Sequence, residues 1–339
     1  MESAKENKIK NIIQVGVIQS VKVIFCFLLS GCLLIGCNQG NRTKIANDKP
    51  NSEARLIVTN IDALELLIGL GAGKNVVGIG NTTTRSFLDG TQSWPGVGRF
   101  QNPNIEAIIN LKPDFVVAYQ RWPDSSFEDK LKPFNIPVER LNGYMANYHS
   151  EVSLLASLVG KESRADTMIH DFDRIVDMVK RTTDIYVKKK VFFEFATDFV
   201  ALGVETGSNE MLELANVTNI TAKLKISYPI VSTEWLLEEQ PEIIIKTISS
   251  DTISVDMYEK LISRTGWDKL DAVKNNQVFL ISSELCSGPR AMIGSLYIGK
   301  WCYPERFTSV NPDSIHSAWL EKYYGITTSN SKFIHTPKI

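Results

Sequence analysis

Two segments of the chain share one pattern, and this repetition limits the fold more than any other feature. Residues 104–117 (NIEAIINLKPDFVV) and 232–245 (STEWLLEEQPEIII) each place a glutamate seven residues before a proline, followed by an acid and three apolar residues. A polar residue that suits a helix N-cap opens each segment, and glutamate in the first turn complements the helix dipole. The proline ends each helix, and the apolar triplet predicts a buried strand. The chain therefore contains two similar α/β units.

Short apolar runs follow helical patterns through both halves of the chain, and this alternation predicts parallel sheets. The expected strands are residues 55–58, 76–79, 115–118, 191–195, 243–245 and 278–281. One stretch interrupts the rhythm, because residues 163–183 carry apolar side chains on a single helical face. This helix, about 30 Å long, can connect two lobes as a rigid strut. Periodicity alone also allows a core helix of one large domain.

The expected architecture is α/β, with two Rossmann-like lobes and parallel sheets joined by one long helix. The 339 residues are 43% hydrophobic, which suits one large domain or two of medium size. We assign residues 55–160 to the N-terminal lobe, 161–184 to the connecting helix, 185–325 to the C-terminal lobe and 326–339 to a tail.

The first 36 residues predict an export signal. Four lysines precede an apolar run from Val23 to Gly36. A helix of that length spans about 21 Å, short of the ~30 Å hydrocarbon core of a membrane. A signal peptide is therefore a better interpretation than a membrane span, with a plain N-terminal anchor helix as the alternative.

The run ends in Leu34-Ile35-Gly36-Cys37, which resembles the lipobox of bacterial lipoproteins. That resemblance implies that Cys37 carries the lipid and that residues 37–54 form a polar tether. A second match ends at Cys32, but cleavage there would leave an apolar mature N-terminus. The expected location is extracytoplasmic and lipid-anchored, in the periplasm or on the outer face of the cell membrane.

Charge and histidine content argue against two classes of partner. The net charge is −1, which gives no electrostatic reason to expect nucleic acid. The four histidines are scattered, whereas a protein for bare zinc or manganese needs converging ligands. No arrangement of catalytic residues or phosphate loop is evident, so we expect neither an enzyme nor a metal site made by the protein alone.

Several segments together resemble the iron-complex and vitamin B12 class of ABC-importer substrate-binding proteins, whose ligands include siderophores, haem and cobalamin. The match extends from about residue 55 to 310 and includes residues 55–58 with 69–73, the 104–117 segment, residues 266–279 and residues 303–307. The resemblance implies a periplasmic-binding-protein fold with a helical backbone and a ligand cleft between the lobes. It also implies a monomer that serves a permease dimer with its ATPase subunits.

In that family one surface glutamate of each lobe docks onto arginines of the permease, and the matching positions are Glu106 and Glu234. Each could instead only cap its own helix. The expected ligand is a ferric siderophore type of chelate or a corrinoid. The alternatives are haem, held by Tyr119, Tyr148 or His149, a bare metal cation, or a cofactor-handling enzyme on the same fold.

Loops expected at the carboxyl ends of the strands are rich in aromatic and cationic residues, which suit a flat, negatively charged chelate. The cleft candidates are Trp94, Arg99, Tyr119, Arg121, Trp122, Tyr148, Trp235 and Arg290. About half of the aromatic residues could instead belong to the lobe cores. Arg290 follows Pro289 at a helix start, where a cation opposes the dipole unless it receives an anion. An ion pair with Glu284 is the alternative.

Overall fold

The computed structural model describes residues 51–81, 94–184, 187–249, 253–327 and 333–337. Residues 49–339 form one compact unit. The export signal, Cys32, Cys37 and most of the tether lie outside the described residues.

The N-terminal lobe is built on a parallel four-stranded sheet in the order β2-β1-β5-β6. Its strands are β1 (Leu56–Val58), β2 (Val76–Ile79), β5 (Phe115–Tyr119) and β6 (Val138–Leu141). Its helices are α2 (Ile61–Gly69), α3 (Ile105–Asn110), α4 (Ser126–Leu131) and α5 (Tyr148–Val159), and β3 (Gly98–Arg99) pairs with β4 (Asn102–Pro103) in a separate antiparallel ribbon.

The C-terminal lobe contains a five-stranded sheet in the order β11-β10-β9-β7-β8. Strands β7 (Lys190–Glu194), β8 (Thr218–Asn219), β9 (Ile243–Ile248) and β10 (Val278–Ser282) are parallel, and β11 (Ile334–His335) runs antiparallel to β10. The helices of this half are α7 (Gly207–Leu214), α8 (Thr233–Glu239), α9 (Val255–Ile262), α10 (Asp271–Lys274), α11 (Ala291–Cys302) and α12 (Pro312–Tyr324). The expected alternation and the two parallel sheets are confirmed.

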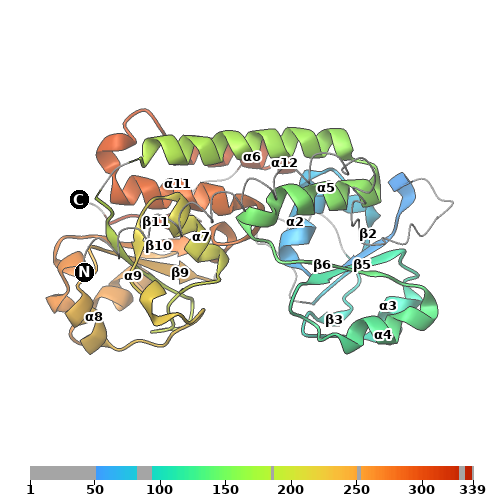
Figure 1. The fold of residues 1–339 in the computed structure, drawn as a ribbon, viewed down its shortest axis with the longest axis horizontal. Coiled ribbons are helices and arrows are strands. Elements are labelled where there is room, and N and C mark those ends of the chain that lie inside the picture. Colours follow the sequence, from blue (N-terminus) through green and yellow to red (C-terminus); the bar gives the residue numbers. More distant parts are fainter. Residues whose placement is uncertain (1–50, 82–93, 185–186, 250–252, 328–332, 338–339) are drawn as a thin grey trace, which may run out of the picture. The chain divides into compact units, whose positions relative to one another are not determined.

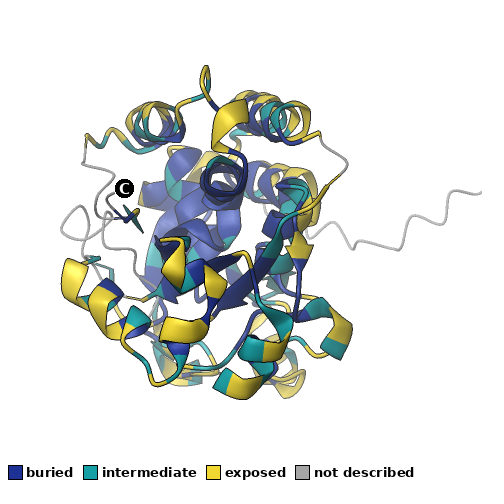
Figure 2. Ribbon diagram, turned by 90° about the vertical axis from the view of Figure 1, so that its left-hand side faces the viewer, coloured by how far each residue is buried: buried dark blue, intermediate teal, exposed yellow. Residues whose placement is uncertain are grey.

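The predicted connecting helix is α6 (Glu162–Thr182), which follows α5 and leads to β7. Its buried face is formed by Ala165, Met168, Phe172, Ile175 and Val179. These side chains belong to one hydrophobic core that also includes residues of both sheets. Figure 1 shows α6 beside α5, α11 and α12 on one side of the two sheets. In Figure 2 the buried residues gather in the sheet and the helix next to it, whereas the outer helices carry exposed residues.

The two similar segments fold alike. Asn104 accepts a hydrogen bond from the Ala107 amide at the start of α3, and Ser232 accepts one from the Trp235 amide at the start of α8. Each helix is followed by an inner strand of its sheet, β5 or β9. The sequence pattern therefore correctly placed the N-caps, the helices and the strands.

The C-terminal residues differ from the expected tail. Strand β11 pairs with β10, and the Ser282 amide donates to the Phe333 carbonyl over 2.7 Å. Phe333 is only 1% exposed, and its ring packs edge-to-face on His316 with centroids 4.7 Å apart. A two-residue strand carries too little periodicity to be recognised in a sequence.

We predict that Phe333→Ala lowers the free energy of unfolding by about 3–5 kcal/mol, because it removes a fully buried ring. Phe134→Ala is the matched control, since Phe134 is 51% exposed and should change stability by less than about 0.5 kcal/mol. Urea unfolding of the two variants measures both effects. Equal urea midpoints for Phe333→Ala and Phe134→Ala would show that the segment containing β11 does not stabilise the C-terminal lobe.

Candidate functional site

The loop after β6 brings the two lobes into contact. The Gly288 amide donates to the Gly143 carbonyl (3.0 Å), and the Tyr144 hydroxyl donates to the Glu205 carbonyl (3.2 Å). The Met145 amide donates to Glu210 Oε2 over 2.8 Å. The carboxyl edge of the N-terminal sheet therefore meets the C-terminal lobe, and this edge is where α/β folds bind ligands.

Three aromatic side chains form a cluster at that edge of the N-terminal lobe. The ring of Phe100 lies edge-on to Tyr119 (5.2 Å between centroids) and to Trp122 (6.0 Å). Trp122 is 48% exposed, and the neighbouring Arg121 is exposed as well. The hydroxyl of Tyr119 accepts the Ile61 amide over 3.2 Å, which orients its ring. The structure thus brings together three of the predicted residues: Tyr119, Arg121 and Trp122.

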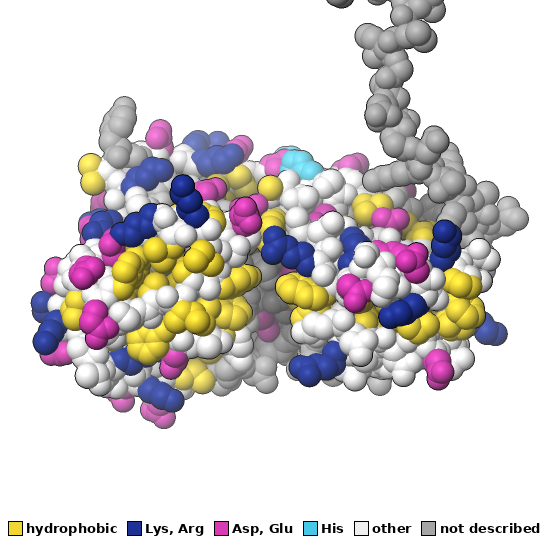
Figure 3. Space-filling view, turned by 60° about the horizontal axis from the view of Figure 1, so that its bottom comes forward, with side chains coloured by type: hydrophobic (Ala, Val, Ile, Leu, Met, Phe, Trp, Pro, Cys, Tyr) yellow, Lys and Arg dark blue, Asp and Glu magenta, His cyan; other side chains and the backbone are white. Residues whose placement is uncertain are grey.

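The C-terminal lobe presents a second aromatic pair. Phe195 and Tyr228 lie edge-to-face with centroids 5.8 Å apart, and both are exposed. Figure 3 shows a broad group of hydrophobic side chains on one face of this lobe and a smaller group on the N-terminal lobe. Burial raises the pKa of Tyr144, and the charges of Tyr228 and Arg121 act on the same hydroxyl. The Tyr144 hydroxyl, bonded to the Glu205 carbonyl, reaches from the N-terminal lobe to the C-terminal lobe.

A charged cavity of about 390 Å³ lies beyond the carboxyl ends of β7 and β9. Lys246, within β9, is 3.1 Å from Glu194 Oε2 and 3.0 Å from Asp198 Oδ1. Arg264 Nη1 is 2.8 Å from Glu194 Oε1. These residues are not among the candidates that the sequence predicts. The available signal was a lysine within the otherwise apolar run IIIKTI, since a lysine in a buried strand needs a partner.

Other predicted residues lie outside the aromatic cluster. Trp94 is partly buried and packs against the larger hydrophobic core. Trp235 is half-buried on α8, with the Lys223 ammonium 5.2 Å from its ring centroid. Arg99 is exposed on β3.

Tyr148 is 3% exposed and stacks on Phe172 of α6 with centroids 3.9 Å apart. His149 Nε2 lies 2.7 Å from Asp173 Oδ1, also on α6. These two side chains face the connecting helix, so we leave both out of the ligand site. Phe172 lies 24 residues beyond Tyr148 in the chain, and no local pattern shows that contact.

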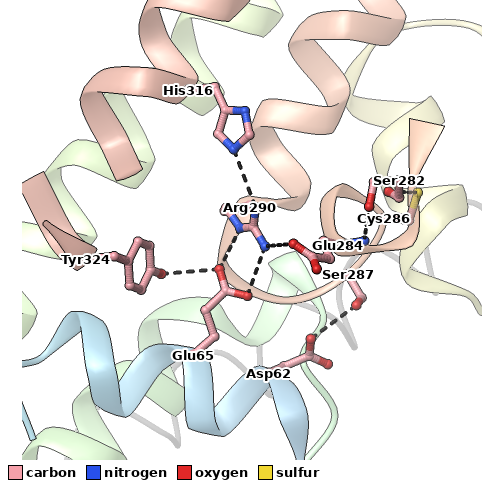
Figure 4. Close-up of polar contacts among 9 residues, drawn as sticks. All are labelled: Asp62, Glu65, Ser282, Glu284, Cys286, Ser287, Arg290, His316 and Tyr324. Carbon is pink, nitrogen blue, oxygen red and sulfur yellow. Dashed lines mark hydrogen bonds and ion pairs between the residues drawn. The ribbon is translucent and has the colours of Figure 1, made fainter. Parts of the chain in front are cut away.

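Arg290 is fully buried (Figure 4) and holds the lobes together. Its Nε lies 2.7 Å from Glu65 Oε1 of α2, and its Nη2 lies 3.1 Å from Glu284 Oε2. The hydroxyl of Tyr324 donates to the same Glu65 oxygen over 3.2 Å. The alternative interpretation, an ion pair with Glu284, is present, and α11 begins only at Ala291. We therefore correct the cleft assignment of Arg290, because its charge is used between two carboxylates.

The two predicted docking glutamates occupy matching positions. Glu106 and Glu234 are exposed, each in the first turn of its helix. A hydrogen bond with Ser232 lowers the pKa of Glu234. Figure 1 shows α3 and α8 on the side of their lobes away from α6. Both carboxylates are thus available to a partner on that side.

The described ranges contain no group of three or more His, Cys, Asp or Glu residues placed to hold a metal ion. No helix among these residues is long and apolar enough to cross a membrane.

A buried carboxylate supports the loop between the lobes. Glu151 Oε1 accepts the Asn142 amide over 2.8 Å, and its Oε2 accepts the Gly143 amide over 3.1 Å. Burial raises the pKa of Glu151 to about 7, and the charges of Asp62 and Glu210 act in the same direction. The pKa of Glu210 is also raised, mainly by burial.

Comparison with known proteins places the chain in a family. A sequence profile described as "Periplasmic binding protein" matches residues 56–285. The uncharacterized ABC transporter substrate-binding lipoprotein YvrC of Bacillus subtilis is 27% identical, with 72% of this chain and 78% of that protein covered. The vitamin B12-binding protein of Vibrio parahaemolyticus is 22% identical, over 69% and 83% of the two chains. The solved structure of MolA from Haemophilus influenzae, bound to molybdate, superposes with a TM-score of 0.71 at 21% identity, covering 83% of this chain and 95% of that one.

We predict that ionisation of Glu151 lowers the free energy of unfolding as the pH rises from about 4.5 to 7. Over that range the folded state binds more protons than the unfolded state, so the free energy of unfolding falls with pH. After a discount for screening by solvent, the free energy of unfolding changes by about 2 kcal/mol over this range. Glu151→Gln should flatten this part of the profile, measured by urea unfolding between pH 5 and 8. A profile unchanged from wild type would refute the assignment.

Proposed function

The chain belongs to the periplasmic binding protein family, and from that premise we propose that it captures an iron chelate or a corrinoid between its lobes. It is the extracytoplasmic substrate-binding component of an ABC importer and not an enzyme. The identity of the ligand and the mode of anchoring are the proposed parts.

The aromatic groups of the two lobes are the observation that carries the ligand class. The Phe100–Tyr119–Trp122 cluster and the Phe195–Tyr228 pair provide flat apolar surfaces, one on each lobe. Such surfaces, with Arg121 nearby, suit a large planar or macrocyclic chelate that carries negative charge. The B12-binding relative supports a corrinoid. A small bare oxyanion such as molybdate would leave the aromatic surfaces unused.

Haem is the second candidate, and one contact disfavours it. Haem iron would take a tyrosine or histidine as axial ligand. The hydroxyl of Tyr119 already accepts the Ile61 amide at the start of α2, so binding iron would break that hydrogen bond.

The lipid anchor rests on Cys37 and its resemblance to a lipobox. The relative YvrC is named a lipoprotein, which supports the proposal. An anchor would keep the protein beside the permease and raise the effective concentration for a weak docking contact. We place that contact at Glu106 and Glu234.

We predict that protein purified from its native host shows the absorbance bands of a ferric chelate or a corrinoid. Trp122→Ala should weaken retention of that chelate by about three- to tenfold, because one wall of the cluster is lost. Phe134→Ala, an equally exposed aromatic away from the cluster, is the control. A Soret band of haem, or equal retention by both variants, would contradict the proposed ligand class.

We further predict that the double variant Glu106→Gln, Glu234→Gln abolishes uptake in cells while its affinity for the chelate stays within about twofold of wild type. Both carboxylates are exposed and neither contributes a ring to the aromatic cluster, so only the permease contact should suffer. The control pairs Asp129→Gln on α4 with Glu238→Gln on α8, which neutralises two other exposed acids of the same lobes. Normal transport by the first double variant would eliminate the docking role.

A further inference from the structure

Two cationic side chains, those of Lys246 and Arg264, have fixed positions in the charged cavity of the C-terminal lobe. Glu194 is fully buried and accepts Arg264 Nη1 through both carboxylate oxygens, at 2.8 and 3.0 Å. It also accepts the Phe199 amide, and Lys246 Nζ lies 3.1 Å from its Oε2. The buried Glu194 carboxylate therefore orients both cationic side chains.

Aromatic rings hold the guanidinium in place. Arg264 Cζ lies 4.8 Å from the ring centroid of Phe199 and 4.7 Å from that of Trp267. Lys246 is fixed because it extends from β9, paired on both sides within the sheet, and is only 5% exposed. Two well-oriented cations on rigid supports are a prepared site for an anion.

The Asp198 carboxylate lies between the Lys246 ammonium and the Arg264 guanidinium. Its Oδ1 lies 3.0 Å from Lys246 Nζ and 2.5 Å from Arg264 Nη2. Burial opposes its ionisation, but the hydrogen bond from Lys246 and the charges of Arg264 and Lys260 outweigh that effect and lower the pKa of Asp198. Unlike the buried Glu194, the Asp198 side chain is 59% exposed and lies outside the helices and strands.

We propose that Lys246 and Arg264 form an oxyanion-binding site, that Asp198 occupies it in the unliganded protein, and that an anionic group of the ligand displaces Asp198. The ligand group would be a carboxylate or another oxyanion, either free in solution or carried by a metal chelate. This inference rests on the proposed function, since it assigns the cavity to the ligand site.

Displacement conserves the ion pairs, because one carboxylate or oxyanion replaces another on the same two cations. Asp198 uses a single oxygen for both contacts. An incoming group with two or more oxygens can give each cation its own acceptor and can also reach Lys260, which lines the same cavity. Asp198 thus competes with the ligand, and it supplies a second carboxylate for two cationic side chains that share only Glu194 otherwise.

The test compares Asp198→Asn with wild type by isothermal titration of the full chain in detergent. Phosphate and molybdate probe a free oxyanion, and ferric citrate probes the carboxylates of a chelate. We expect Asp198→Asn to bind at least one of these probes about tenfold more tightly, because the competing carboxylate is gone. The probe that gains most identifies the source of the anion.

Glu259→Gln is the matched control, because it removes one negative charge from exposed α9 without touching the pair. A gain that Glu259→Gln reproduces, or no gain with any probe, would overturn the oxyanion site. Adding Lys246→Gln to Asp198→Asn should remove the gain. If that double variant does not fold, the comparison of Asp198→Asn with Glu259→Gln decides alone.

The outcomes also separate this inference from the proposed function. Chelate bands that depend on Trp122, without any effect of Asp198→Asn, would refute only the oxyanion site. Tighter binding of phosphate by Asp198→Asn, in a protein that carries no chelate, would refute only the chelate.

Discussion

The relation between the two lobes depends on one guanidinium that has no access to water. Burying Arg290 costs several kcal/mol unless carboxylates replace its hydration, and the two that do so come from different parts of the chain. Glu65 lies on α2 in the N-terminal lobe, and Glu284 follows β10 in the C-terminal lobe. Separating α2 from the β10–α11 connection would therefore break the ion pair between Arg290 and Glu65. This contact favours a small adjustment of the lobes around the Arg290 ion pairs over a wide opening.

The aromatic groups that we propose for the ligand site have the opposite character. Trp122, Tyr228 and Phe195 are exposed, and the contacts that cross between the lobes near them are single hydrogen bonds, such as that from Tyr144 to Glu205. A rigid buried ion network beside a set of accessible aromatic rings is a suitable arrangement for a binding protein. The network maintains the geometry of the site, and the rings can adapt to a large ligand at low cost.

Local patterns in the sequence predicted much of this fold, and contacts between distant residues account for what they missed. The caps at Asn104 and Ser232, the helices that follow and the apolar face of α6 are encoded within a few residues of each other. Arg290 and Glu65 are 225 positions apart, so the main partner of the arginine had no local signal. Tyr148 was assigned to the cleft because its place in a loop suggested exposure, whereas Phe172 buries it. The sequence predicts Tyr119, Arg121 and Trp122 but not their contact with Phe100, and the partners of Lys246, Glu194 and Asp198, lie about 50 residues away in the chain.

The late position of α12 and β11 in the chain affects how an exported protein can acquire its structure. Tyr324 of α12 contacts Glu65, near the start of the N-terminal lobe, and β11 completes the edge of the C-terminal sheet. Neither lobe therefore has its full set of native contacts until residues beyond 320 have emerged on the far side of the membrane. During vectorial passage the earlier segments are left without these partners, so premature collapse into a stable native lobe is disfavoured. Folding of either lobe to its final form is therefore tied to the last residues of the chain.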